Sequence, residues 1–248
     1  MKLSESRAVI TGGVSGLGAA TARAFRTAGA AVTIFDRDAG RGAEFAASIG
    51  ATFAAVDVTD EASVTLGIAA ARSSMGGIDI LINCAGIATG ERTLGRDGPH
   101  GLASFRRTVD INLVGSFNCL RLAAAEMAHN TGDPKGVIIN TASIAAYDGQ
   151  KGQAAYAASK AGIAGMTLPV ARDLASLGIR VCAIAPGIFA TPMLCALPQD
   201  VQMSLAAEVS YPKRLGDPAE SAALAGFIVE CDYLNGEVIR LDGALRMR

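Results

Sequence analysis

The chain has 248 residues, of which 50% are hydrophobic and 18% are charged, so a disordered chain is excluded and a folded protein is predicted. The formal net charge of -1 leaves no basic stripe to hold a phosphate backbone, and we expect no nucleic-acid binding. No apolar run approaches the roughly 18 residues that span a bilayer, and residues 1–7 lack the apolar segment of a secretion signal.

Short β-branched and apolar runs alternate with longer Ala-rich segments. The runs of strand length are Ala8–Thr11, Ala31–Phe35, Thr52–Val56, Ile80–Asn83, Val137–Thr141, Ile179–Ala185 and Val238–Leu241. The helix-length segments include Leu17–Ala28, Asp60–Ser74, Leu102–Met127 and Gln153–Leu177. This alternation predicts an α/β fold, and continuous apolar strands indicate a parallel sheet covered on both faces. We expect one domain over residues 1–248, a doubly wound parallel sheet with about seven buried strands.

A glycine-rich turn follows the first strand. Gly12, Gly16 and Gly18 lead from that strand into a helix. Without Cβ atoms they allow backbone N–H groups and the helix N-terminus to approach a pyrophosphate. An ordinary strand-to-helix turn could carry the same glycines. We expect this turn, with Ser15 and Leu17, to bind a dinucleotide.

An acidic residue follows the second strand. Asp36 lies 18 positions after Gly18, close to the spacing of about 20 at which a carboxylate accepts the adenosine ribose hydroxyls. This carboxylate would repel a 2′-phosphate, so we expect NAD rather than NADP. Arg37 could neutralise such a phosphate, but we interpret it as a solvated loop charge.

The next two strands also end in candidate cofactor contacts. Asp57 and Val58 follow the third strand, and Cys84, Ala85 and Gly86 follow the fourth. Ligands of open α/β sheets bind at these carboxyl ends. Two structural alternatives stay open, because Asp57 could cap the next helix and Gly86 could serve a turn.

Two long connections interrupt the alternation of strands and helices. Residues 87–104 are polar and glycine-rich, and loops of this length are usually functional or mobile. Residues 187–212 are apolar but interrupted by prolines, so we expect a lid over an apolar ligand rather than a core strand. Its large apolar residues include Phe189, Met193, Leu194, Leu197, Val201, Met203 and Leu205.

The catalytic candidates lie around the fifth strand and the following helix. Tyr156 and Lys160 are four apart and share a helix face, and Ser143 precedes Tyr156 by 13 residues. A phenol with a pKa near about 10 becomes a base at neutral pH only when a cation such as Lys160 stabilises the phenolate. Ser143 would hold the reacting oxygen beside the phenol.

A second pair with the same spacing is Tyr147 and Lys151. Glycines flank this pair, so we predict a loop in which four-residue spacing does not bring side chains together. Asn112, within a predicted helix, could hold a water between Lys160 and solvent through its side chain or a freed carbonyl. It could equally bond locally.

The metal-binding residue types are few and scattered. The five cysteines contain no C-x-x-C pair and the two histidines lack ligand spacing, so we expect neither a disulfide framework nor a metal. A reducing compartment, the cytoplasm, fits best.

These residues in this order resemble the short-chain dehydrogenase/reductase family, over nearly the whole chain. The resemblance implies a Rossmann-like fold and a catalytic tetrad of Ser143, Tyr156, Lys160 and Asn112, with Tyr156 as general acid/base and Lys160 also binding the nicotinamide ribose. It adds Pro186 and Gly187 to the cofactor site. The family's commoner Asn-Asn-Ala-Gly is Asn-Cys-Ala-Gly at 83–86, which removes one amide side chain and keeps the backbone contact.

Residues 149–156, 187–192, 212–218 and 234–243 look like the type II 3-hydroxyacyl-CoA dehydrogenase branch, whose members also act on some steroids. This likeness implies NAD, acyl-CoA thioesters with a secondary hydroxyl, and a homotetramer. It implies that Phe189 and Thr191 close over the nicotinamide and that Gln153 lines the substrate pocket. Arg92 and Arg96 in the long loop could meet CoA phosphates or remain solvated.

Three alternatives to this 3-hydroxyacyl-CoA dehydrogenase stay open. An NADPH-dependent 3-oxoacyl reductase is opposed by Asp36. A hydroxysteroid dehydrogenase would use the same residues. A nucleotide sensor without chemistry would need no phenol beside a lysine, so Tyr156 and Lys160 speak against it.

Overall fold

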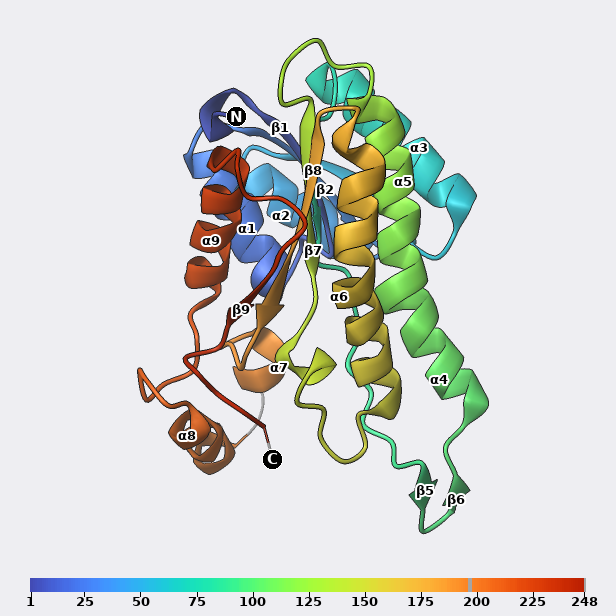
Figure 1. Cartoon of the computed structure of the whole chain (residues 1–248), viewed down its shortest axis with the longest axis vertical. Coiled ribbons are helices and arrows are strands. Elements are labelled where there is room, and N and C mark those ends of the chain that lie inside the picture. Colours follow the sequence, from blue (N-terminus) through green and yellow to red (C-terminus); the bar gives the residue numbers. More distant parts are fainter. Residues whose placement is uncertain (196–197, 248) are drawn as a thin grey trace.

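In the part of the chain that the structure describes, seven parallel strands form the central sheet in the order β3-β2-β1-β4-β7-β8-β9. The strands are β1 (Arg7–Thr11), β2 (Ala31–Asp36), β3 (Thr52–Ala55), β4 (Ile80–Asn83), β7 (Gly136–Thr141), β8 (Ile179–Pro186) and β9 (Val238–Leu241). The computed structural model describes residues 1–195 and 198–247. The predicted doubly wound α/β fold is confirmed (Figure 1).

The direction of winding reverses between β1 and β4. From β1 the chain proceeds outward through β2 to β3, and from β4 it proceeds the other way through β7 and β8 to β9. In open α/β sheets the ligand crevice lies at such a switch point, outside the carboxyl ends of the strands. The topology therefore places the site beside the ends of β1 and β4.

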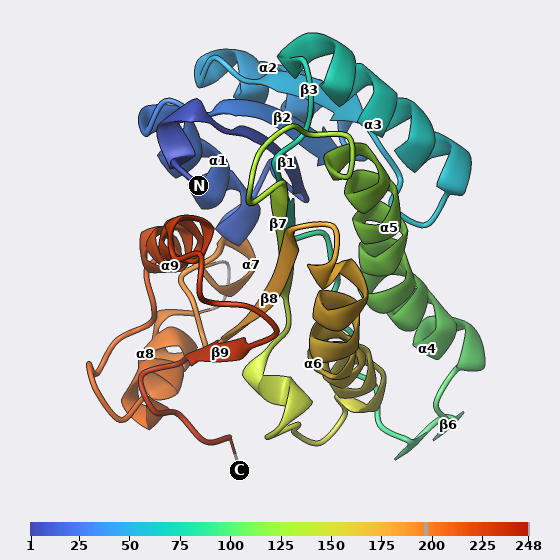
Figure 2. The same cartoon turned by 45° about the horizontal axis from the view of Figure 1, so that its top comes forward.

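Helices cover both faces of the sheet, as Figures 1 and 2 show. On one face lie α1 (Gly16–Thr27), α2 (Ala39–Ser48) and α9 (Pro218–Glu230), and on the other lie α3 (Glu61–Met75), α5 (Gly115–Met127) and α6 (Ala154–Ala175). Phe25 of α1 and Leu120 of α5 are buried against opposite faces. Burial of such apolar side chains stabilises the layered arrangement.

The expectation of seven buried strands was wrong for the two edges. Thr52 and Ala55 of β3 are exposed, and all four residues of β9 are only half-buried. Each edge strand has one neighbouring strand instead of two. Their apolar composition therefore does not translate into full burial.

The predicted helix over residues 102–127 contains a change of pitch. It begins as α4 (Leu102–Val109), widens into a π-helical turn (Asp110–Val114) and continues as α5. The N–H of Gly115 bonds to the carbonyl of Asp110 across this turn. A Cβ on Gly115 would lie 2.6 Å from a methyl of Val58, so the close approach requires glycine. Such single π-turns often mark functional sites.

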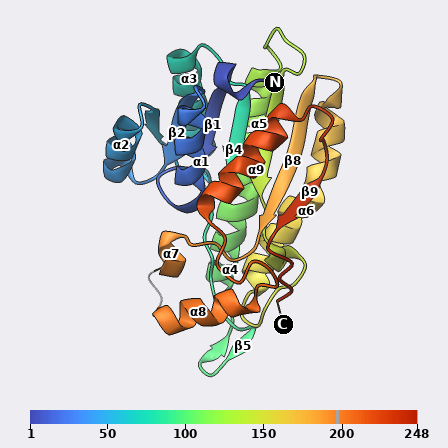
Figure 3. The ribbon, with the colours of Figure 1, turned by 90° about the vertical axis from the view of Figure 1, so that its left-hand side faces the viewer.

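The two long connections contain short elements. The first holds a hairpin of β5 (Leu94–Gly95) and β6 (Gly98–Pro99) and ends where α4 begins, before the expected end at residue 104. The second holds α7 (Pro192–Cys195) and α8 (Gln199–Glu208), and Figure 3 shows α8 below α7 and just above the hairpin of β5. Leu197 and the side chain of Met193, both assigned to the expected lid, lie outside the described residues.

Short 3-10 turns occupy Leu3–Glu5 and Ile144–Ala146. Within residues 1–195 and 198–247, no helix combines the length and apolarity needed to cross a membrane.

Candidate active site

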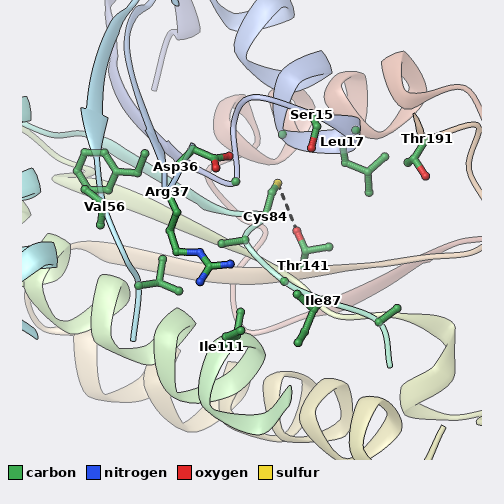
Figure 4. Close-up of a pocket in the computed structure, with 18 of the residues that line it drawn as sticks. Ser15, Leu17, Asp36, Arg37, Val56, Cys84, Ile87, Ile111, Thr141 and Thr191 are labelled. Atoms are coloured by element: carbon green, nitrogen blue, oxygen red, sulfur yellow. Dashed lines mark hydrogen bonds between the residues drawn. The ribbon is translucent and has the colours of Figure 1, made fainter. Parts of the chain in front are cut away.

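A cavity of about 420 Å³ opens at the switch point between β1 and β4 (Figure 4). Most of the predicted cofactor residues line it: Gly12, Ser15, Gly16, Leu17, Gly18, Asp36, Asp57, Val58, Cys84, Ala85, Gly86, Tyr156, Lys160 and Thr191. Sequence reasoning missed Phe35, Val56, Ile87, Ala88, Ile111, Thr141 and Pro192, which also line it. Most of these flank predicted residues along the chain, which is the only local indication of their position.

The glycine turn fits a dinucleotide because its backbone is closely packed. Gly12 has φ +62°, and a Cβ there would lie 2.7 Å from the backbone nitrogen of Ala85. A Cβ on Gly18 would overlap the carbonyl oxygen of Gly12. Among the described residues, no side chain caps α1, although Ser15 occupies the N-cap position. The first N–H groups of α1 are therefore free for an anion at the cavity wall.

The acidic end of the cavity has one carboxylate in an ion pair and one without. Asp36 accepts hydrogen bonds from the backbone of Val14 at 3.4 Å and Asp38 at 3.2 Å. The Arg37 guanidinium lies 3.8 Å from the Asp57 carboxylate and points into the cavity in Figure 4. Arg37 was expected to be a solvated loop charge. Its side chain is 59% exposed, yet it lines the cavity.

The helix-capping alternative for Asp57 was wrong. Asp60 caps α3 by accepting from the backbone of Ala62 at 2.9 Å. Asp57 instead accepts from the N–H and hydroxyl of Thr59 at 2.9 and 2.7 Å. These bonds orient its carboxylate at the cavity wall.

The helix α6 carries Tyr156 and Lys160 on one face, one turn apart. The amine of Lys160 lies 5.8 Å from the centre of the Tyr156 ring and donates to the carbonyl of Thr141 at 2.6 Å. Burial lowers the pKa of Lys160 to about 8, and the charge interaction with Cys84 partly offsets this shift. The Thr141 hydroxyl in turn donates to the Cys84 sulfur at 3.5 Å (Figure 4).

Ser143 lies beside Tyr156. Burial raises the pKa of the Tyr156 phenol, and a side-chain hydrogen bond with Ser143 partly offsets that rise. The Ser143 hydroxyl oxygen also accepts from the backbone of Ala145 at 3.1 Å, as the cap of the short turn over Ile144–Ala146. The structure thus brings the three predicted catalytic side chains together.

The alternative pair Tyr147 and Lys151 does not form a site. Both residues lie in turns and are exposed, and the Tyr147 ring stands 5.3 Å from the guanidinium carbon of Arg240. Neither residue lines the cavity at the switch point or the neighbouring cavity that contains Ser143. The spacing of four is catalytically useful only on a helix.

Asn112 lies in the π-turn and is fully buried. Its side-chain oxygen accepts from the N–H of Ile87 at 2.8 Å, and its amide donates to the Ile87 carbonyl at 2.9 Å and the Ser159 hydroxyl at 3.0 Å. Its own carbonyl accepts from Ser116 at 2.7 Å. Asn112 therefore fastens the loop after Gly86 to α6.

Gly86 leaves room for two neighbouring polar groups, so its role is not limited to a turn. A Cβ there would lie 3.1 Å from the Asn112 side-chain oxygen and 3.7 Å from the Lys160 amine. Its lack of a side chain lets both groups approach the cofactor loop.

A second cavity, of about 330 Å³, adjoins the first and shares Leu17, Thr141, Tyr156 and Thr191 with it. Ser143 and Gln153, predicted to contact substrate, line this second cavity. Three residues predicted for the cofactor, Pro186, Gly187 and Phe189, line it too and do not line the first, because β8 ends on that side. Arg92 and Arg96 are exposed in the hairpin region and line neither cavity.

This fold and arrangement agree with the known proteins that the chain resembles. The short chain dehydrogenase family matches residues 6–202. The chain belongs to this family, and it is an oxidoreductase of the kind that uses nicotinamide cofactors.

Individual relatives confirm the narrower resemblance. The chain is 52% identical to the 3-hydroxyacyl-CoA dehydrogenase type-2 of Homo sapiens, over 97% of this chain and 95% of that protein. The protein of the same name from Drosophila melanogaster is 50% identical, over 96% of both chains. A crystal structure of 3-hydroxyacyl-CoA dehydrogenase type-2 from Mycobacterium avium superposes with a TM-score of 0.93 at 42% identity, over 97% of this chain and 96% of that chain.

Proposed function

We propose that the chain is an NAD-dependent dehydrogenase that interconverts 3-hydroxyacyl-CoA and 3-oxoacyl-CoA. The observation that carries the reaction type is the position of Tyr156, which lines both cavities and shares the second with Ser143. The substrate class rests on the names of the relatives, which share half of their residues with this chain.

The choice of NAD rests on Asp36. Within residues 1–195 and 198–247, no cation pairs with this carboxylate, whereas Arg37 is paired with Asp57. An unneutralised carboxylate accepts ribose hydroxyls and repels a 2′-phosphate. Arg37 is the feature that favours the alternative NADPH-dependent reductase, because it could turn toward such a phosphate.

Four residues of the chain have distinct roles in the proposed reaction. A nicotinamide cofactor bound in the first cavity supplies or accepts the hydride. Tyr156 exchanges a proton with the substrate oxygen, and Ser143 holds that oxygen by a hydrogen bond. The Lys160 ammonium favours the phenolate form of Tyr156 by its charge. Asn112 acts by fixing the loop against α6, next to Lys160.

The second cavity suits an apolar chain next to the reacting carbon. Phe189, Leu194 and Leu205, from the segment over residues 187–212, contribute apolar walls. We infer that this segment is the lid over the acyl or steroid moiety. The same cavity could take a steroid alcohol, so a hydroxysteroid dehydrogenase is the second candidate.

Assembly and compartment follow the same proposal. Apolar side chains stay exposed in the single chain, among them Val114, Phe117 and Phe227, and a homotetramer would cover such groups. All five cysteines are free thiols, which fits a reducing compartment such as the cytoplasm. Light scattering of the purified protein tests the assembly.

The decisive assay follows the absorbance of reduced nicotinamide while the protein meets acetoacetyl-CoA, with NADH and NADPH in parallel. Rapid oxidation of NADH alone is the expected result. A preference for NADPH would overturn the cofactor assignment. Binding of NADH without turnover would overturn the substrate class, and steroid ketones would then be tested.

A further inference from the structure

The end of the chain returns to the substrate cavity. Met247 lines this cavity together with Gln150 and Gln153 from the segment that precedes α6. Leu245, two residues earlier, is buried to 1% exposure. Figure 1 shows this end of the chain at the same edge of the molecule as α8. The segment over residues 242–247 is thus packed beside the site although β9 lies at the far edge of the sheet.

Arg240 of β9 attaches this segment to the loop before α6. Its guanidinium contacts Asp148 of that loop at 2.5 Å and Asp242 at 2.8 Å, and it donates to the carbonyl of Leu245 at 3.1 Å. The side chains of Arg240 and Asp148 are only 23% and 18% exposed. A bond network with this little exposure holds its geometry better than a surface ion pair.

Tyr147 belongs to the same contact. Its ring lies 5.3 Å from the guanidinium carbon of Arg240. The second Tyr-x-x-x-Lys motif therefore contributes to an anchoring point of the C-terminal segment.

The other side of the segment is held by the end of the lid. The N–H of Tyr211 donates to the carbonyl of Gly243 at 3.1 Å, and the Ser210 hydroxyl donates to the carbonyl of Ala244 at 3.0 Å. A Cβ on Gly187 would lie 2.8 Å from the Cα of Asp242, so the segment also touches the end of β8. Three elements separated in sequence therefore fix its position.

We propose that residues 242–247 form a fixed wall of the substrate cavity, in which Met247 limits the apolar chain that the cavity accepts and Arg240 is the positioning residue that holds the wall. The class of substrate, an acyl thioester, rests on the proposed function. A thioether side chain is flexible and apolar, and its size sets the depth of the cavity at that point. Substrates with short chains end before the wall and are insensitive to it.

The test compares acetoacetyl-CoA with the long-chain thioester 3-oxododecanoyl-CoA. Met247→Ala is expected to raise the ratio of kcat/KM for the long over the short substrate by about tenfold, in the range for a few methylenes in an apolar pocket. Met247→Trp is expected to lower that ratio by a similar factor. An unchanged ratio in both variants would overturn the role of Met247.

The positioning role is tested with Arg240→Gln and with Asp148→Asn, which removes the same contact from the other side. Both are expected to change the long-to-short ratio by at least about threefold, since the wall loses its anchor. A purely structural role would lower kcat/KM for both substrates equally and leave the ratio unchanged. Arg72→Gln is the matched control, because Arg72 of α3 pairs with Glu126 at 3.5 Å, is exposed and lines neither cavity. It is expected to leave the ratio unchanged.

A binding measurement separates this inference from the proposed function. Cis-parinaric acid, a fluorescent fatty acid, reports an apolar cavity without turnover. If the natural chain fails to reduce acetoacetyl-CoA, the proposed function fails, whereas a several-fold change in parinarate Kd in Met247→Ala would still support the wall. If Met247→Ala changed neither the parinarate Kd nor the long-to-short ratio of kcat/KM, the proposed wall would be wrong, and the proposed function would be unaffected.

Discussion

The Lys160 amine lies one helical turn from the Tyr156 ring, at 5.8 Å from its centre, and is held there by the carbonyl of Thr141. This places a buried cation beside a half-buried phenol, and the phenol lies at the junction of two cavities. Neither group is in its most stable environment, because burial disfavours the charged form of each. The arrangement is expected to cost stability and to serve catalysis.

The two tyrosine pairs give the first prediction. Tyr156→Phe removes the hydroxyl that exchanges the substrate proton, and turnover is expected to fall by about 10²–10⁴-fold. Tyr147→Phe keeps its ring over Arg240 and is expected to retain most of the activity. Steady-state rates with NADH and acetoacetyl-CoA measure both. Loss of activity in Tyr147→Phe but not in Tyr156→Phe would show that Tyr147, and not Tyr156, is the catalytic tyrosine.

The buried amine of Lys160 is expected to lower the free energy of unfolding while it serves catalysis. Because the folded pKa of Lys160 is about 8 against 10.5 for an exposed lysine, the folded chain binds fewer protons between these values. The contribution of Lys160 to stability therefore rises with pH through that window and is unfavourable at neutral pH.

Lys160→Met is accordingly expected to abolish most turnover and to raise the free energy of unfolding at neutral pH by about 1–2 kcal/mol. The gain is reduced by the lost hydrogen bond to Thr141. Urea unfolding at neutral and at alkaline pH, compared with the natural chain, measures it. The advantage of the variant should shrink as pH rises, and a constant difference would contradict the assigned pKa.

Cofactor choice is tested at Asp36. Asp36→Ala is expected to lower kcat/KM for NADH by about 10–100-fold and to raise it for NADPH, since the repulsion of a 2′-phosphate is removed. Asp38→Asn is the control, because Asp38 caps α2 and lies outside the cavity, and asparagine caps a helix equally well. If Asp36→Ala kept the preference for NADH over NADPH, the cofactor would be selected by Arg37 instead.

The glycine turn is tested at Gly12. Gly12→Ala forces a side chain against Ala85 at positive φ and is expected to cost about 1–3 kcal/mol of stability. NADH affinity, measured by fluorescence titration, is expected to fall as well. Gly90→Ala is the control, because among the described residues nothing lies within 4 Å of the added Cβ. Equal NADH affinity in both variants would argue against the turn as the pyrophosphate contact.

Local patterns were sufficient for much of the site. The strands that end at Thr11, Asp36 and Asn83 are short apolar runs, and their boundaries depend on neighbouring residues only. The choice of Tyr156 over Tyr147 needed only helical periodicity against a glycine-flanked loop. Both kinds of information lie within a few positions of the residue concerned, so they can be read from the sequence.

Other features depend on contacts between distant parts of the chain. No periodic pattern in the sequence indicates the ion pair of Arg37 with Asp57 or the hydrogen bonds of Asn112 with Ile87. The same holds for the change to π-helical pitch before Gly115. The same is true of the division of the site into two cavities, of which Phe189, predicted to contact the cofactor, lines the second.

The sequence by itself determined the order of strands and helices and the residue types of the chemistry, because these depend on hydrophobic periodicity and local spacing. Only the tertiary structure decided which walls the cavities have. Met247 lines the same cavity as Gln153 because β9 follows α9 at the edge of the sheet and Arg240 bonds to Asp148, a contact across 92 positions of the chain. Closing so long a loop is a property of the whole fold, which no local pattern encodes.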